Sequence, residues 1–100
     1  DALAQVADFL LATEGVDTVV VYGPRQGRVI LSARTRHPDL HLGRTLATRF
    51  PDGQAGGHRS LAGGQVPFTG LVDEETPAAE DAISAMTGAL RDLLGGEGDE

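Results

Sequence analysis

Hydrophobic residues recur at helical spacing near both ends of the chain. The two stripes are Leu3, Val6 and Leu10 near the start, and Ala79, Ile83, Met86, Leu90 and Leu93 near the end. They predict a helix over residues 1–15 that stops at Gly15 and buries its stripe, and a second helix close to the C-terminus. Thr76 is expected to cap this second helix, and Pro77 to occupy its first position.

The apolar pattern between these helices is typical of β-strands. A predicted strand over 16–23 contains three consecutive valines, which indicates burial on both faces, as in a central strand. A turn over 24–27 joins it to a second strand over 28–36, and the short link makes the two strands antiparallel. A third strand is predicted over 63–70, where Pro67 favours an edge position or a bulge.

Two features lie between the second and third predicted strands. Asp39 is positioned to cap a short apolar helix that ends at Phe50. A glycine-rich stretch follows, and residues 58–62 are long enough for one or two helical turns. A glycine pair that leads into a helix start exposes several backbone N–H groups, and such groups favour phosphate or carboxylate. The alternative is a glycine turn beside a surface histidine.

The predicted element order is α-β-β-α-β-α, which indicates an α/β fold with helices packed on a small mixed or antiparallel sheet. The length of 100 residues fits one domain, expected over 1–94, followed by an acidic flexible tail over 95–100. Because the chain begins at Asp1 and not Met, we interpret it as part of a longer protein. A cytoplasmic location without membrane contact is expected, since cysteine and long apolar runs are absent.

Charge is distributed unevenly along the chain. The net charge is −7, lysine is absent, and seven of the eight arginines lie within 25–64, where only Asp39 and Asp52 oppose them. A basic segment in an acidic protein indicates an anion site, although its arginines could instead pair with acids of the flanking helices. The acidic, lysine-free composition also suits solubility in concentrated salt and indicates a halophilic source.

The second predicted strand places two polar side chains together. Because side chains alternate along a strand, Ser32 and Arg34 share one face, opposite the face of Leu31 and Ala33. A hydroxyl beside a guanidinium matches a phosphate group well. The alternative is an ordinary solvent-facing side of a half-exposed sheet.

Two motifs, "LSARTR" and, some twenty residues later, "AGGHRSLAGG", resemble the DHHA1 domain. This is the C-terminal substrate-binding domain of the DHH phosphoesterases, which include RecJ-like exonucleases and NrnA-type oligoribonuclease and pAp phosphatases. The matching positions are Ser32, Arg34, Gly56, Gly57, His58, Ala62 and Gly63, with Thr35 in place of a second serine. The departures are Gln54 and Ala55, where many relatives have further glycines, and Leu61 in place of an alanine.

The resemblance implies that the arginine and the Gly-Gly-His loop hold the phosphate and sugar of a nucleotide, across a cleft from a catalytic domain. The expected phosphate-binding residues are Ser32, Arg34, Thr35, Gly56, Gly57, His58 and Arg59. The family's metal, usually manganese, is bound by a separate N-terminal domain with an Asp-His-His signature, and no such triplet occurs in this chain. We therefore expect no metal, cofactor or catalytic residue here, an inactive fragment, and a metal-dependent phosphoesterase as the parent protein.

The expected partners are a short RNA or DNA, or a mononucleotide or dinucleotide phosphate, and an upstream DHH domain in the same polypeptide. A second copy of the chain, in a homodimer, is a further candidate. The four aromatic residues disfavour a long single-strand platform and favour a short substrate gripped by its phosphate. The alternative function is a small-ligand regulatory or dimerisation domain with no hydrolase role. An Asp-His-His region upstream of Asp1 would separate the two.

Overall fold

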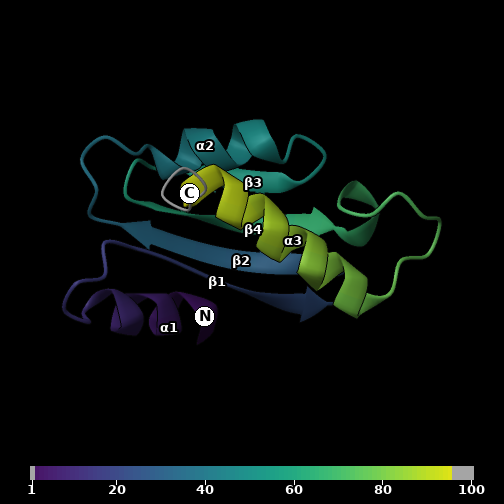
Figure 1. Ribbon diagram of the computed structural model, residues 1–100, viewed down its shortest axis with the longest axis horizontal. Helices are drawn as coiled ribbons and strands as arrows, with labels where there is room; N and C mark the ends of the chain where they lie inside the picture. Colours follow the sequence, from purple (N-terminus) through teal and green to yellow (C-terminus); the bar gives the residue numbers. More distant parts are fainter. Residues whose placement is uncertain (1, 96–100) are drawn as a thin grey trace.

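A computed structural model of the chain describes residues 2–95 and shows an α/β fold (Figure 1). The elements are α1 (Ala2–Leu11), β1 (Thr18–Arg25), β2 (Arg28–Thr35), α2 (Leu42–Arg49), β3 (Gln54–Gly57), β4 (Leu61–Pro67), the short 3₁₀ helix η1 (Phe68–Gly70) and α3 (Ala79–Leu94). The predicted fold class is confirmed, with one strand more than expected. Apart from Gly95, the expected acidic tail lies outside the described residues. Within residues 2–95, no helix has the length and apolar character needed to cross a membrane.

The four strands form one antiparallel sheet in the order β1-β2-β4-β3. The strand with three valines, β1, is an edge strand, so its predicted central position is wrong. Its valines are partly buried because the sheet carries helices on both faces at this point. Val20 packs against the main core, whereas the register places Val19 and Val21 on the face that α1 contacts.

The main core lies between the sheet and the helices α2 and α3 (Figure 1). The sheet contributes Val29, Leu31, Ala33, Ala62 and Val66 to it, which are neighbours on one face because the register pairs β2 with β4. Leu42 and Leu46 of α2 and Met86 of α3 are fully buried against these side chains. The predicted alternation along β2 and the stripe of the last helix are thereby confirmed at their central positions.

The helix α1 packs on the opposite face, over β1 and β2. Its predicted buried stripe is wrong, because Val6 and Leu10 are exposed and Ala7 is the buried residue. The helix approaches the sheet through a small side chain, whereas Leu3 of the predicted stripe is half-buried and Val6 and Leu10 face outward. Its C-terminal end is held by Arg36, whose Nη2 donates to the Leu11 carbonyl oxygen at 2.5 Å.

The glycine-rich stretch does not lead into a helix. It forms strand β3, and residues 58–60 form the turn of a β3–β4 hairpin. The backbone groups of this turn are already bonded: the N–H of Leu42 donates to the Arg59 carbonyl at 2.9 Å, and that of Gly43 to the His58 carbonyl at 2.9 Å. Because the turn's carbonyls accept from α2, they are not free to form helical hydrogen bonds, and the predicted short helix is wrong.

Three boundaries also differ from the predictions. The N-cap of α2 is His41 and not Asp39, and α3 starts at Ala79 with Ala78 as its N-cap, later than Thr76 and Pro77. Pro67 is the last residue of β4, which lies inside the sheet. A proline is accommodated at that position because the ladder with β2 ends there.

Removing the cap at His41 is expected to destabilise the fold. The His41 Nδ1 accepts a hydrogen bond from the Arg44 N–H at 3.1 Å, which satisfies one donor of the helix terminus. His41→Ala should lower the free energy of unfolding by about 0.5–2 kcal/mol, measured by urea denaturation. His41→Asn keeps an acceptor at the cap and should lose less. Equal losses in the two variants would show that the cap bond contributes nothing.

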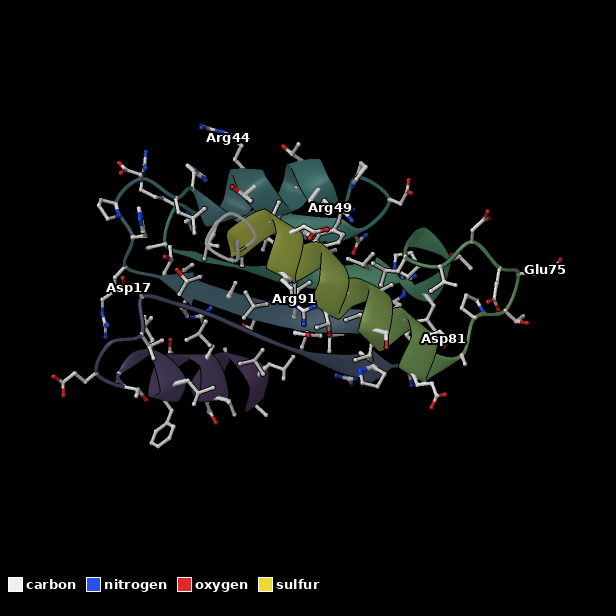
Figure 2. The ribbon with its side chains drawn as sticks, in the orientation of Figure 1. Asp17, Arg44, Arg49, Glu75, Asp81 and Arg91 are labelled. Carbon is white, nitrogen blue, oxygen red and sulfur yellow. The ribbon has the colours of Figure 1, made fainter. Side chains whose placement is uncertain are left out.

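The arginines of the basic segment do not gather on one surface. Arg44 and Arg49 lie on α2 (Figure 2), while Arg25, Arg28 and Arg34 lie on the hairpin β1–β2. Arg91, the arginine outside the segment, lies on α3. The three arginines of the hairpin therefore lie where they can contribute to a site on the sheet, whereas Arg44, Arg49 and Arg91 lie on helices.

Candidate functional site

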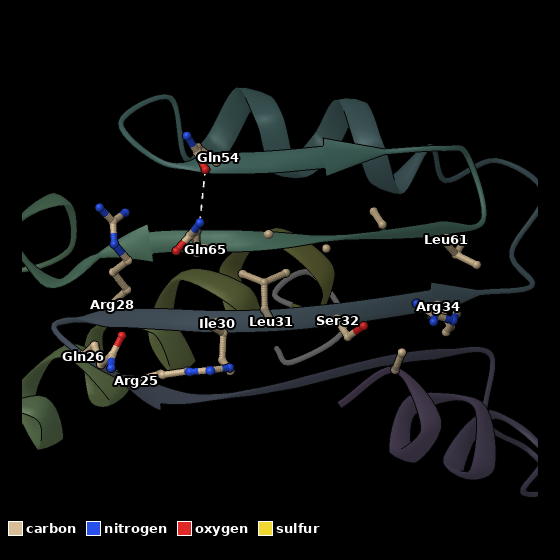
Figure 3. A pocket seen from close by; sticks show the side chains of 14 residues that line it. Arg25, Gln26, Arg28, Ile30, Leu31, Ser32, Arg34, Gln54, Leu61 and Gln65 are labelled. Carbon is tan, nitrogen blue, oxygen red and sulfur yellow. Dashed lines mark hydrogen bonds between the residues drawn. The ribbon is translucent and has the colours of Figure 1, made fainter. Parts of the chain in front are cut away.

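A groove of about 800 Å³ lies on the sheet face opposite α2 and α3 (Figure 3). It runs over β2 and β4, with the β1–β2 turn at one end and Arg34, close to α1, at the other. Three of its lining residues are arginines: Arg25, Arg28 and Arg34. None of the described residues that line it carries a carboxylate. The groove is therefore basic, although the chain as a whole is acidic.

The strand period explains which side chains reach the groove. Arg28, Ile30, Ser32 and Arg34 occupy alternate positions of β2 and share the face turned away from the main core. The register places Ser32 opposite Gly63 of β4, where no side chain covers it. The predicted pairing of Ser32 with Arg34 on one face is what the structure shows.

Ser32 presents an unpartnered hydroxyl to this groove. The residue is only 8% exposed and is one of the lining residues. Within residues 2–95, its hydroxyl forms no hydrogen bond. No buried side-chain nitrogen or oxygen atom of the described residues lacks a partner, so this hydroxyl is open to the groove, where it can donate to a ligand.

Arg34 is held rigidly at the same end of the groove. It is 8% exposed, and its Nε donates to Asp8 Oδ1 of α1 at 2.7 Å, while its Nη1 donates to the Ala33 carbonyl at 2.8 Å. The alternative considered for the basic segment thus applies to Arg34, which is paired with an acid of a flanking helix. The Nη2 group, however, forms no hydrogen bond with any residue among 2–95. It is a donor that a ligand could use.

Thr35 lies on the other face of β2, and its hydroxyl is engaged within the fold. Its Oγ1 is 2.8 Å from Thr18 Oγ1 and 3.2 Å from the Asp17 carbonyl oxygen, and it accepts from the His37 N–H at 3.0 Å. These contacts tie the end of β2 to the start of β1. The structure does not bring Thr35 to the groove.

The remaining expected residues, Gly56, Gly57, His58 and Arg59, lie on β3 and the β3–β4 turn. None of them lines the groove, but the turn adjoins its Arg34 end, because Leu61 is both the register partner of Arg34 and a lining residue. His58 and Arg59 are exposed, and Arg59 Nη1 donates to the Pro38 carbonyl at 3.3 Å. Of the seven expected residues, two therefore lie in the groove, two lie in the adjacent turn, and the other three, Thr35, Gly56 and Gly57, lie elsewhere on the sheet.

Comparison with known proteins identifies the family of the chain. The family model of the DHHA1 domain matches residues 1–92. The chain belongs to the DHHA1 domain family. It is also similar to the uncharacterized protein MJ1633 of Methanocaldococcus jannaschii, with 38% identity over 90 residues, which cover 85% of this chain and 18% of that protein. The chain thus spans less than a fifth of this relative's length.

Glycines of the "AGGHRSLAGG" motif, and one glycine of α2, have a packing role in this structure. A Cβ on Gly43 of α2 would overlap the carbonyl group of Gly57, and a Cβ on Gly64 would overlap the carbonyl of Gln54. Gly57 also has a φ of +140°, which side chains rarely adopt, and a Cβ there would lie 2.8 Å from the Cα of Ala62. The glycines are required where α2, β3 and β4 approach one another most closely.

Several groove residues of this DHHA1 domain were missed by the sequence interpretation. These are Arg25, Gln26, Arg28, Gln54 and Gln65. Arg28 could have been found, because it follows the same alternation as Ser32 and Arg34. Gln54 and Gln65 could not, because their neighbouring positions depend on the unexpected strand β3, across which Gln65 Nε2 donates to Gln54 Oε1 at 3.1 Å.

The donors of the groove fit an anion and not a metal. Arginine, glutamine and serine side chains supply N–H and O–H donors, whereas manganese requires carboxylate, imidazole or similar ligands. Across residues 2–95, no group of three or more histidine, cysteine, aspartate or glutamate side chains is placed to hold a metal ion. The manganese that the resemblance implies would need ligands from outside residues 2–95.

Proposed function

We propose that this DHHA1 domain binds the phosphate of a nucleotide or short nucleic acid, as the substrate-binding part of a DHH-family phosphoesterase. The observation that carries the proposal is the Ser32 hydroxyl, which has no partner among residues 2–95 and opens to the groove beside Arg34, in a basic groove with no carboxylate among its described lining residues. One phosphate oxygen would accept from Arg34 Nη2 and another from Ser32 Oγ. The Arg34 guanidinium is held in place by its bonds to Asp8 and the Ala33 carbonyl before the ligand arrives, which lowers the entropic cost of binding.

The His58–Ser60 turn would complete the site at the Arg34 end. The hydrogen bonds from α2 fix the turn through its carbonyl oxygens, so the exposed side chains of His58 and Arg59 remain turned to solvent. They are positioned for a sugar or a second phosphate that extends beyond Leu61. Arg59 contributes charge, and His58 can donate or accept a hydrogen bond.

Hydrolysis would take place on a partner domain. In this proposal an upstream DHH domain of the same polypeptide holds manganese and cleaves the phosphoester, and the DHHA1 domain binds and orients the substrate. The RecJ-like or NrnA-like assignment, with RNA, DNA, pAp or a dinucleotide as substrate, belongs to the same proposal. Halophilic origin, cytoplasmic location and a homodimer remain predictions from the sequence.

Nucleotide titration followed by NMR tests this proposal. On adding pAp to the ¹⁵N-labelled chain at constant salt, we expect chemical-shift changes at residues 32–34 and 58–63, because these flank the proposed phosphate position. Residues of α2 beyond its first turn, and those of α3, should change little and serve as the internal control. Saturable changes confined to α2 or α3, or none at all, would contradict the proposal and favour the regulatory or dimerisation alternative.

A further inference from the structure

The groove continues well beyond Ser32 and Arg34. Its other end is formed by Arg25, Gln26 and Arg28 at the β1–β2 turn (Figure 3). Arg25 and Arg28 are direct cross-strand partners, an arrangement that is unfavourable for two like charges. Within residues 2–95, the ion pair found is that of Arg34 with Asp8, so no described carboxylate neutralises either arginine. This end of the groove carries two uncompensated positive charges.

The turn itself holds a third polar side chain at this end. Gln26 has a φ of +52° and Gly27 a φ of +79°, as in a two-residue hairpin turn of type I′. Asparagine, aspartate or glycine is favoured at the first of these positions, and glutamine is not. The glutamine side chain lines the groove beside the two arginines. The turn thus combines an unfavourable residue with an unfavourable charge pair, and a bound anion would relieve the repulsion within that pair.

The two cationic ends are far apart. Arg28 and Arg34 are separated by six residues along β2, which corresponds to about 20 Å in an extended strand. Between the two ends the lining of the groove is uncharged. Its floor includes Ile30 of β2 and Gly63 of β4, and the hydrogen-bonded pair of Gln54 and Gln65 lies beside it. At the rise of a stacked strand, about 3.4 Å per nucleotide, this span accommodates about six nucleotides, and a mononucleotide cannot reach both ends.

We infer that Arg25, Gln26 and Arg28 form a second phosphate subsite, and that the groove binds a short single-stranded oligonucleotide lengthwise along β2. One phosphate would lie at Ser32 and Arg34, and another at the β1–β2 turn, with sugars and bases over Ile30 and the glycines between. The described lining contains no aromatic side chain for base stacking, so binding should depend on length and charge more than on base sequence. This inference rests on the proposed function, because it takes the Ser32–Arg34 end as the first phosphate position.

A charge-matched pair of variants tests the second subsite in the full 100-residue chain. Arg25→Gln with Arg28→Gln removes two charges from the groove, and Arg44→Gln with Arg91→Gln removes two from α2 and α3, on the other side of the sheet. Dissociation constants for pAp and for a single-stranded RNA hexanucleotide are measured by NMR or fluorescence anisotropy at several salt concentrations. Circular dichroism shows whether each variant remains folded.

The groove variant should bind the hexanucleotide about tenfold more weakly or worse, because two charge-assisted contacts are lost. Each phosphate contact to a single strand contributes about 0.7 to the slope of log affinity against log salt concentration. The loss of two contacts should therefore make the slope of the groove variant shallower by about 1.4. Its affinity for pAp should change by less than about twofold, since pAp does not reach the turn. The α2–α3 variant should bind both ligands almost as the parent chain does.

Two other outcomes would overturn the inference. If both variants bind the hexanucleotide equally weakly, the effect comes from the net charge of the protein and not from a subsite. If the groove variant binds it as tightly as the parent chain, the subsite is excluded. In either case, binding of pAp that still shifts residues 32–34 would leave the proposed function intact. If neither ligand shifts those residues in the parent chain, the proposed function and the second subsite both fail.

Discussion

Gly43→Ala is expected to be among the most destabilising single-methyl changes in this protein, although alanine normally favours helices. The added Cβ would overlap the carbonyl group of Gly57, which belongs to backbone and cannot rotate away. The N-terminus of α2 would have to move off β3. This movement would break the bonds from Leu42 and Gly43 to the turn carbonyls and disturb the packing of the fully buried Leu42 and Leu46. We expect a loss of about 3 kcal/mol or more in the free energy of unfolding.

Gly88→Ala provides the matched control for Gly43→Ala. Gly88 lies in the interior of α3, and a Cβ there would meet no heavy atom within 4 Å. Alanine should therefore raise the free energy of unfolding by about 0.4–1 kcal/mol, through helix propensity and a less flexible unfolded chain. Urea denaturation of both variants checks the opposite signs. A neutral or stabilising result at Gly43 would mean that α2 and β3 are less closely packed than described.

Arg34→Ala is expected to weaken pAp binding by roughly ten- to a hundredfold, because a charge-assisted contact to phosphate is worth about 1.5–3 kcal/mol. Arg91→Ala on α3 should leave the affinity nearly unchanged and is the charge control. Equal affinities of the two variants would show that Arg34 does not bind the phosphate. Gly57→Val is less informative, since a side chain there would collide with the backbone of β4 and disturb the fold itself.

Asp8→Asn separates binding by Arg34 from its structural pairing. The asparagine oxygen can still accept from Arg34 Nε, but the negative charge beside the groove is gone. Because Asp8 is 65% exposed, the ion pair should contribute only about 0–1 kcal/mol to stability. We therefore expect pAp affinity that is equal to that of the parent chain or higher. A loss as large as that of Arg34→Ala would indicate that Arg34 serves only to hold α1 in place.

The parts of the fold that were predicted correctly are those in which local spacing decides the outcome. The alternation of Leu31 and Ala33 against Ser32 and Arg34 marks the two faces of β2, and the 3.6-residue stripe marks α3. Strand β3 carries no such signal, because its sequence is Gln-Ala-Gly-Gly. It becomes a strand through the ladder with β4 and the close contact of α2, which are long-range effects. The apolar stripe of α1 gave a wrong prediction of the buried face, because the residue that faces the sheet is the small Ala7 and not one of the larger residues of the stripe.

The same division holds for the candidate site. The common direction of Ser32 and Arg34 follows from strand geometry alone, and Arg28 could have been added by the same rule. The Arg34–Asp8 pair could not be foreseen, because it depends on where α1 crosses the sheet. The sequence predicts that the glycines contact a phosphate, whereas the structure shows them at the contacts of α2, β3 and β4. A glycine motif indicates that another group lies close to the backbone, but it does not show whether that group is a ligand or a neighbouring helix or strand.

The way in which α2 holds the hairpin turn bears on how this surface could evolve. The helix bonds to the backbone carbonyls of His58 and Arg59, and the side chains of residues 58–60 are exposed. Mutations at these three positions can therefore accumulate at little folding cost, while the path of the turn is preserved. The domain thus has a small region in which ligand preference can drift or be redesigned, supported by glycines that tolerate almost no change.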